Sequence, residues 1–105
     1  MLGLLYINNQ LVGEVSLKII DESMGVIGGH LTPSLAYGQF RQQIQECYAR
    51  KGVANSSDFN LKMMISDRAM DGQGGISITN SLDFPDEIEV DIAGVSSEVL
   101  SEITS

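Results

Sequence analysis

Only a few side chains in this sequence could perform covalent or acid–base chemistry. The chain has one histidine, His30, and one cysteine, Cys47. A cysteine and a histidine can act as nucleophile and base when they lie within hydrogen-bond distance. Cys47, however, falls on the apolar stripe of an expected helix, where a thiol is normally an inert small hydrophobic group. We therefore expect no enzymatic activity, and one histidine cannot form a metal site by itself.

A glycine-rich stretch at residues 25–32 runs from an expected strand towards an expected helix N-terminus, a topology that can bind phosphate. Its spacing matches neither G-x-G-x-x-G nor G-x-x-x-x-G-K-[ST]. Glycines in such a place more often form a bulge or allow two segments to pass closely. A small-molecule or phosphate ligand, without an implied cofactor, is therefore an alternative function, and the residues that would bind it are Gly25, Gly28, Gly29 and His30.

Carboxylates are the most numerous ionisable groups, and they are unevenly distributed. Residues 1–68 contain six acidic and six basic side chains, whereas residues 69–105 contain eight acidic side chains and no basic one. The spacing of these acids does not match a calcium-binding loop, so we expect no metal site. Because side chains alternate along a strand, two of the acids should share one solvent-exposed face. The acids of interest are Asp83, Asp86, Glu87, Glu89 and Asp91.

This charge distribution predicts a protein partner with a basic surface, because an acidic surface can steer such a partner and raise its association rate. We predict a non-enzymatic protein-binding module whose acidic C-terminal third docks on that partner, in the manner of an inhibitor or immunity-type protein. Nucleic acid is excluded as a ligand, because phosphate-backbone binding needs clustered lysine and arginine. Solubility alone is the simpler explanation of the charge. A structural homo-oligomer, built through a strand edge or the glutamine-rich helix face, is a second alternative.

Several features predict a single cytoplasmic domain over residues 1–105. One cysteine excludes an intrachain disulfide and suits a reducing compartment. The apolar residues 1–7 are too few for a signal peptide and lack a basic region. No apolar run approaches the ~18 residues of a membrane-spanning helix, so we expect no membrane partner.

The element that must organise the chain is a long helix expected over residues 32–52. Thr32 or Ser34 could cap it, with Pro33 at the first helical position, and Gly52 would end it. Its apolar stripe consists of Ala36, Tyr37, Phe40, Ile44, Cys47 and Tyr48. Its polar face consists of Gln39, Gln42, Gln45, Glu46 and Arg50.

The remaining pattern predicts an α+β fold. Apolar runs and alternation predict strands at residues 2–7, 12–20, 24–31, 59–66, 76–80 and 87–92. Turns are expected at residues 8–10 and at Asp71-Gly72, loops at 53–58 and 67–75, and a short C-terminal helix at 95–103, capped by Ser96. The order βββ-α-βββ predicts a mostly antiparallel sheet of five or six strands with one long helix packed on one face. A barrel closed around the helix is the alternative.

Overall fold

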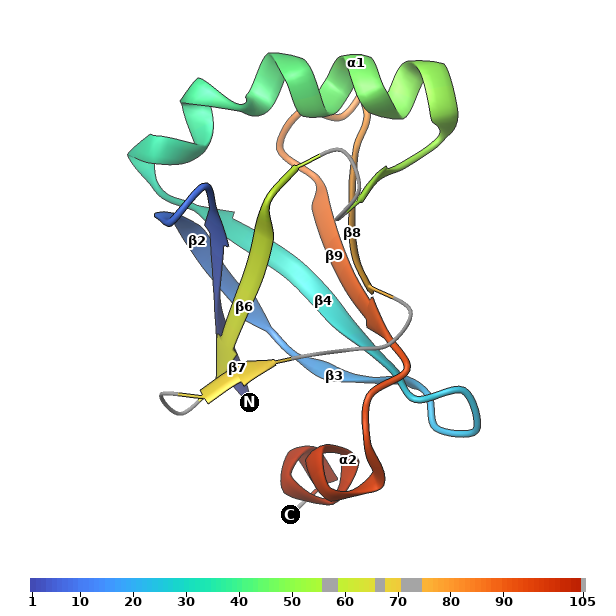
Figure 1. Ribbon diagram of the computed structural model, residues 1–105. Coiled ribbons are helices and arrows are strands. Elements are labelled where there is room, and N and C mark those ends of the chain that lie inside the picture. The colour runs from blue at the N-terminus through green and yellow to red at the C-terminus, as the bar shows by residue number, and fades with distance from the viewer. Residues whose placement is uncertain (56–58, 66–67, 71–74, 105) are drawn as a thin grey trace.

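The computed structural model describes residues 1–55, 59–65, 68–70 and 75–104, and in it the chain has an α+β fold (Figure 1). The strands are β1 (Leu2–Ile7), β2 (Gln10–Ser16), β3 (Lys18–Asp21), β4 (Val26–Pro33), β5 (Ala54–Asn55), β6 (Leu61–Ile65), β7 (Arg68–Met70), β8 (Gly75–Asn80) and β9 (Ile88–Ala93). The helices are the 3₁₀ segment η1 (Leu35–Gln39), α1 (Arg41–Lys51) and α2 (Ser97–Thr104).

The strands form one curled sheet in the order β5-β8-β9-β4-β2-β1-β6-β7, with β3 also paired to β4. Every pairing between the described strands is antiparallel. In the part of the chain that the structure describes, the sheet therefore has nine strand segments rather than five or six strands. Two short segments, β5 and β7, lie where loops were expected. The Asp71-Gly72 turn lies outside the described residues.

The curl depends on a break in the long strand expected over residues 12–20. The C-terminal half of β4 pairs with β2 and its N-terminal half with β3. Between the two pairings, the carbonyl oxygen of Ser16 approaches Gly29 so closely that a Cβ at Gly29 would overlap it. Glycine at this position allows the chain to bend without a steric clash, as expected where two segments approach closely.

The expected long helix is only partly confirmed, because the helical segment starts later and its first part is a 3₁₀ turn. Thr32 and Pro33 belong to β4, and Thr32 pairs with Glu14 of β2. Thr32 and Pro33 therefore pair with the sheet, although local capping preferences predicted that they would start the helix. The helical segment begins as the 3₁₀ turn η1 and continues as α1 after Phe40. Its end is as predicted, with Gly52 in the left-handed region at φ 82°.

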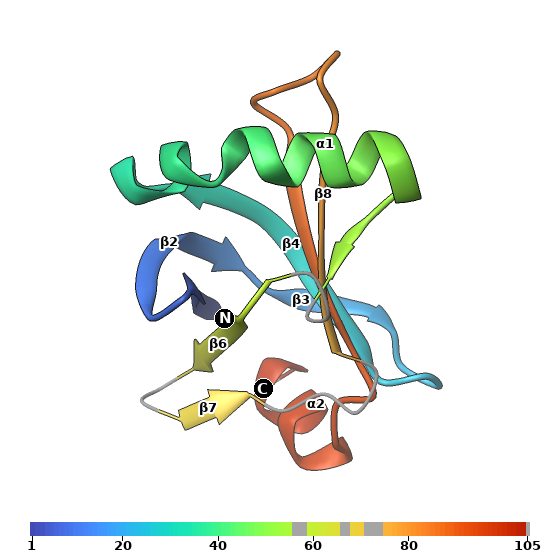
Figure 2. The same cartoon turned by 45° about the horizontal axis from the view of Figure 1, so that its top comes forward.

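The segments η1 and α1, which we call the helical layer, lie across one end of the curled sheet (Figures 1 and 2). The helix α2 lies at the opposite end. Most of the predicted apolar stripe is confirmed, because Tyr37, Phe40, Ile44 and Cys47 are buried in the core. Gln45, expected on the polar face, is instead only 7% exposed. The short C-terminal helix is also confirmed, and Ser96 Oγ accepts a hydrogen bond from Val99 N at 3.5 Å.

A buried amide connects the helical layer to the loop between β8 and β9. Asn80 is 0% exposed, and its Oδ1 accepts a hydrogen bond of 2.9 Å from the Tyr37 hydroxyl. Its Nδ2 donates to the carbonyl oxygens of Pro85 at 3.1 Å and Glu87 at 3.3 Å. Arg41 also donates to the Pro85 carbonyl, and its guanidinium carbon lies 5.0 Å from the centre of the Tyr37 ring. One side chain thus holds both η1 and the returning end of the loop.

Replacing Asn80 with alanine should lower the free energy of unfolding by about 2–3 kcal/mol, because it leaves the buried Tyr37 hydroxyl without a partner. Tyr37→Phe should cost about 1–2 kcal/mol, because it leaves Asn80 Oδ1 unpaired. Urea unfolding of both single variants and the double variant measures the coupling between them. Strictly additive losses would show that the hydroxyl and the amide do not depend on each other.

The same hydroxyl predicts a sensitivity to alkali. Burial raises the pKa of Tyr37 from 10.0 to about 12, although the positive charge of Arg41 opposes the shift. The unfolded chain therefore loses its tyrosine proton first, and stability should fall as the pH rises from 10 towards 12. Thermal unfolding across this range should show a smaller decline for Tyr37→Phe than for the parent. An equal decline in stability for the parent and the variant would show that the Tyr37 hydroxyl does not cause the sensitivity to alkali.

Candidate functional site

The loop between β8 and β9, residues 81–87, projects past α1 at one end of the molecule (Figure 2). Besides the Asn80 contacts, it is held by hydrogen bonds within itself. The backbone N–H of Asp83 donates to Ser81 Oγ at 3.1 Å, and that of Phe84 donates to the Ser81 carbonyl at 3.3 Å. The N–H of Glu87 donates to the Phe84 carbonyl at 3.0 Å. The loop therefore has a defined conformation.

The loop and the start of β9 bring most of the predicted acids together. Four of them are exposed, and we call this set the acidic surface: Asp83, Asp86, Glu87 and Glu89. Sequence reasoning overlooked two apolar side chains in the same loop, Leu82 at 64% exposure and Phe84 at 60%. Their position within an acidic turn, where apolar residues have no core to enter, was the available signal.

Asp91 differs from the other predicted acids. It alternates with buried neighbours as expected, but it is only partly exposed, because it lies opposite Gly28 of β4 and Ser77 of β8. Its Oδ1 is buried and has no hydrogen-bond partner among the described residues. Burial raises the pKa of Asp91, and the negative charge of Glu89 raises it further. Asp91 therefore has a desolvation cost and is not an exposed part of the acidic surface.

The glycine-rich stretch does not lead directly into a helix. Gly28 and Gly29 lie within β4, and the helical layer begins only at Leu35. Gly25 lies before β4 with φ 66°. A Cβ at Gly28 would overlap Asp91 Oδ1, so that glycine accommodates the neighbouring carboxylate. The phosphate-ligand alternative stays a prediction.

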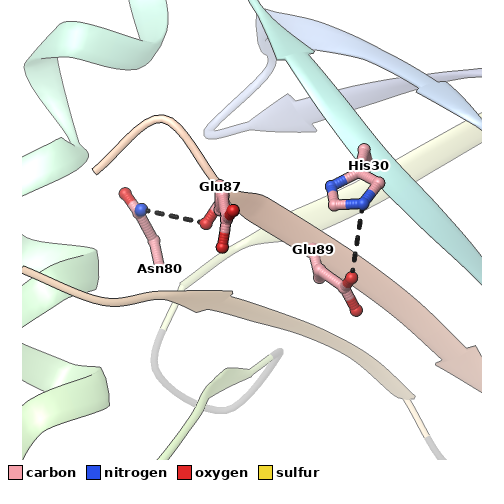
Figure 3. A network of polar contacts seen from close by, with 4 residues as sticks. All are labelled: His30, Asn80, Glu87 and Glu89. Carbon is pink, nitrogen blue, oxygen red and sulfur yellow. Dashed lines mark hydrogen bonds and ion pairs between the residues drawn. The ribbon is translucent and has the colours of Figure 1, made fainter. Parts of the chain in front are cut away.

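His30 and Cys47 lie in different environments. His30 is on the exposed side of β4, with its Nε2 3.6 Å from Glu89 Oε1 and its side chain 70% exposed (Figure 3). Cys47 is 3% exposed in the core, and its thiol donates to the Val53 carbonyl at 3.5 Å. Within the described residues, no group of three or more histidine, cysteine or acidic side chains could hold a metal ion. Among those residues there is also no helix with the length and apolarity to cross a membrane.

A hollow of about 210 Å³ lies beside the acidic surface, and we call it the acidic hollow. Three of its lining residues were selected as site residues from the sequence, and four were not. Its lining consists of His30, Tyr48, Thr79, Ser81, Phe84, Glu87 and Glu89. These residues come from β4, α1, β8, β9 and the β8–β9 loop, so only the tertiary structure assembles them. Two aromatic rings and two carboxylates make this hollow suited to a cationic group.

A larger hollow of about 470 Å³ lies near α2, between the β3–β4 turn and the start of that helix. Five of its nine lining residues are serine or glycine, and Glu22 is the one charged residue among them. It contains none of the acids selected from the sequence. We therefore take the acidic surface and its hollow as the candidate site.

Comparisons of the chain with protein-family models, with curated proteins and with solved structures find no match. The function is therefore inferred from the geometry of this chain alone.

Asp91→Asn should stabilise the protein at neutral pH, because it removes a partly buried charge and its repulsion with Glu89. The gain should be about 0.5 kcal/mol, since water screens a partly exposed group. A raised folded-state pKa means that the parent gains stability as the pH falls through that pKa, and the variant should lack this gain. Chemical unfolding at neutral and mildly acidic pH measures both effects. A variant less stable than the parent at neutral pH would contradict the interpretation.

Proposed function

We propose that this chain is a non-enzymatic protein-binding module whose acidic surface docks on a basic surface of a partner protein. The observation that carries the proposal is the exposure of Asp83, Asp86, Glu87 and Glu89 on one projecting loop and the strand that follows it. These acids lie in the part of the chain, residues 69–105, that has no basic side chain. A concentrated negative field of this kind accelerates encounter with a positively charged partner.

Within the described residues, none of these acids forms an ion pair with a lysine or an arginine, although Lys18 lines a neighbouring hollow that includes Glu89. Arg41 donates to a backbone carbonyl of the loop, and no acidic side chain of the acidic surface is ion-paired to it within the described residues. Both side chains of the His30–Glu89 contact are exposed to solvent, so the contact contributes little free energy. The acids are therefore available to a partner.

The loop also supplies apolar contact area. Leu82 and Phe84 are mostly exposed, while the backbone beside them is held by the Asn80 network. Apolar side chains on a preorganised loop lose little conformational entropy when they bind, which favours affinity. Acids around exposed apolar groups match a partner surface in which basic residues surround an apolar patch. By covering such a surface in the cytoplasm, the chain would act as an inhibitor of its partner.

Reversing two loop charges tests the proposal. A partner is first captured from a lysate of the source cell at low salt, identified and purified. Asp83→Lys combined with Asp86→Lys should then slow association with that partner about tenfold at low salt. The effect should shrink as salt is added, because screening removes long-range attraction. Stopped-flow or surface-based kinetics measures the rate.

The matched control is Glu22→Lys combined with Glu98→Lys. These exposed acids lie at the other end of the molecule, near the β3–β4 turn and α2, and give the same change in net charge. The control should associate at nearly the parent rate. If the two double variants associate equally fast, the acidic surface does not guide the partner.

A further inference from the structure

We propose that the acidic hollow binds the guanidinium group of an arginine side chain presented by the partner. The inference rests on the proposed function and makes it more specific, because it assigns one residue type of the partner to one place on this chain. It stands on the shape and lining of the hollow, which the acidic surface alone does not provide.

Two carboxylates in the lining of the hollow supply the charge. Glu87 is the last residue of the β8–β9 loop and Glu89 is the second residue of β9, and both side chains line the hollow. Within the described residues, Glu87 makes no ion pair, and the one ion pair of Glu89 is the exposed contact with His30 at 3.6 Å (Figure 3). A guanidinium could therefore reach both carboxylates, and charge-assisted hydrogen bonds to a carboxylate are among the stronger ones in proteins.

Two aromatic side chains supply a complementary surface. Tyr48 enters the hollow from α1 and Phe84 from the β8–β9 loop. A planar guanidinium stacks on aromatic rings and interacts with their π electrons, and it does so more often than a lysine ammonium. The hydroxyl oxygens of Thr79 and Ser81, which also line the hollow, can accept the remaining N–H groups.

The size of the hollow suits a single side chain. Small-molecule and cofactor sites usually measure about 300–1,000 Å³. At about 210 Å³, the acidic hollow has room for one side chain. The two carboxylates oppose any anion, including phosphate. A basic side chain that arrives attached to a protein satisfies both the size and the charge.

The lining is held in place before any ligand arrives. The backbone of Phe84 bonds to Ser81 and to Glu87, and Asn80 Nδ2 donates to the Glu87 carbonyl at 3.3 Å. The ring and one of the carboxylates therefore start from a backbone that the core fixes through Tyr37. Preorganisation of this kind reduces the entropy cost of binding.

A titration of the purified protein with a defined probe tests the inference without the partner. The probe is Nα-acetyl-arginine N-methylamide, and its neutral analogue with citrulline in place of arginine is the ligand control. Amide resonances of Thr79, Ser81, Glu87 and Glu89 are followed by ¹H–¹⁵N NMR. We expect saturable shifts with the arginine probe. The citrulline analogue should bind at least about fivefold more weakly than the arginine probe. Equal shifts with both compounds, or no saturation with arginine, would overturn the inference.

Paired variants separate the hollow from general electrostatics. Glu87→Gln should weaken arginine binding about fivefold, whereas Asp86→Asn, in the same loop but outside the lining, should change it less than twofold. Phe84→Ala should weaken it similarly, whereas the equally exposed Leu82→Ala should not. Matching effects within either pair would overturn the inference. If the arginine probe does not bind but association with the partner still depends on the loop charges, only this inference is disproved. If association with the partner does not depend on those charges, the proposed function is disproved.

Discussion

The buried side chain of Asn80 is the contact on which the positioning of the candidate site depends. Its oxygen receives the Tyr37 hydroxyl from the helical layer, and its nitrogen holds the carbonyls of Pro85 and Glu87. Because the Asn80 side chain and the Tyr37 hydroxyl are buried, breaking the bond between them would leave a polar group unsatisfied at a substantial cost. The β8–β9 loop can therefore project into solvent and still keep one shape.

Strand alternation explains why the same segment serves the core and the surface. In β9, Ile88, Val90 and Ile92 are buried, while Glu89 points outward. Asp91 shows the cost of this arrangement, because the same periodicity places a carboxylate over Gly28, where one of its oxygens is unpaired. The sheet tolerates that carboxylate because glycine leaves room for it. An acidic strand face in the middle of a sheet thus has a stability cost that an acidic loop does not have.

The acidic surface and the acidic hollow have different physical roles. Charges on a projecting loop act over distances set by salt screening, and they influence how fast a partner arrives. The hollow acts only at contact, where aromatic rings and carboxylates determine which side chain fits. Exposed Leu82 and Phe84 connect the two, because they add apolar contact next to the charges.

The sequence by itself determined what depends on neighbours along the chain. Apolar runs and alternation located β1, β6, β8, β9 and α2, and the capping preference of glycine located the end of α1 at Gly52. The count of charged residues gave the acidic character of residues 83–91. Tertiary structure decided what depends on contacts between distant segments. Pairing with β2 kept Thr32 and Pro33 in a strand, the approach of Ser16 to Gly29 bent the sheet, and Gly28 partly covered Asp91. Tyr48 and Phe84 meet Glu87 and Glu89 only after the sheet curls beneath the helix, because these residues belong to separate elements whose distance no local pattern specifies.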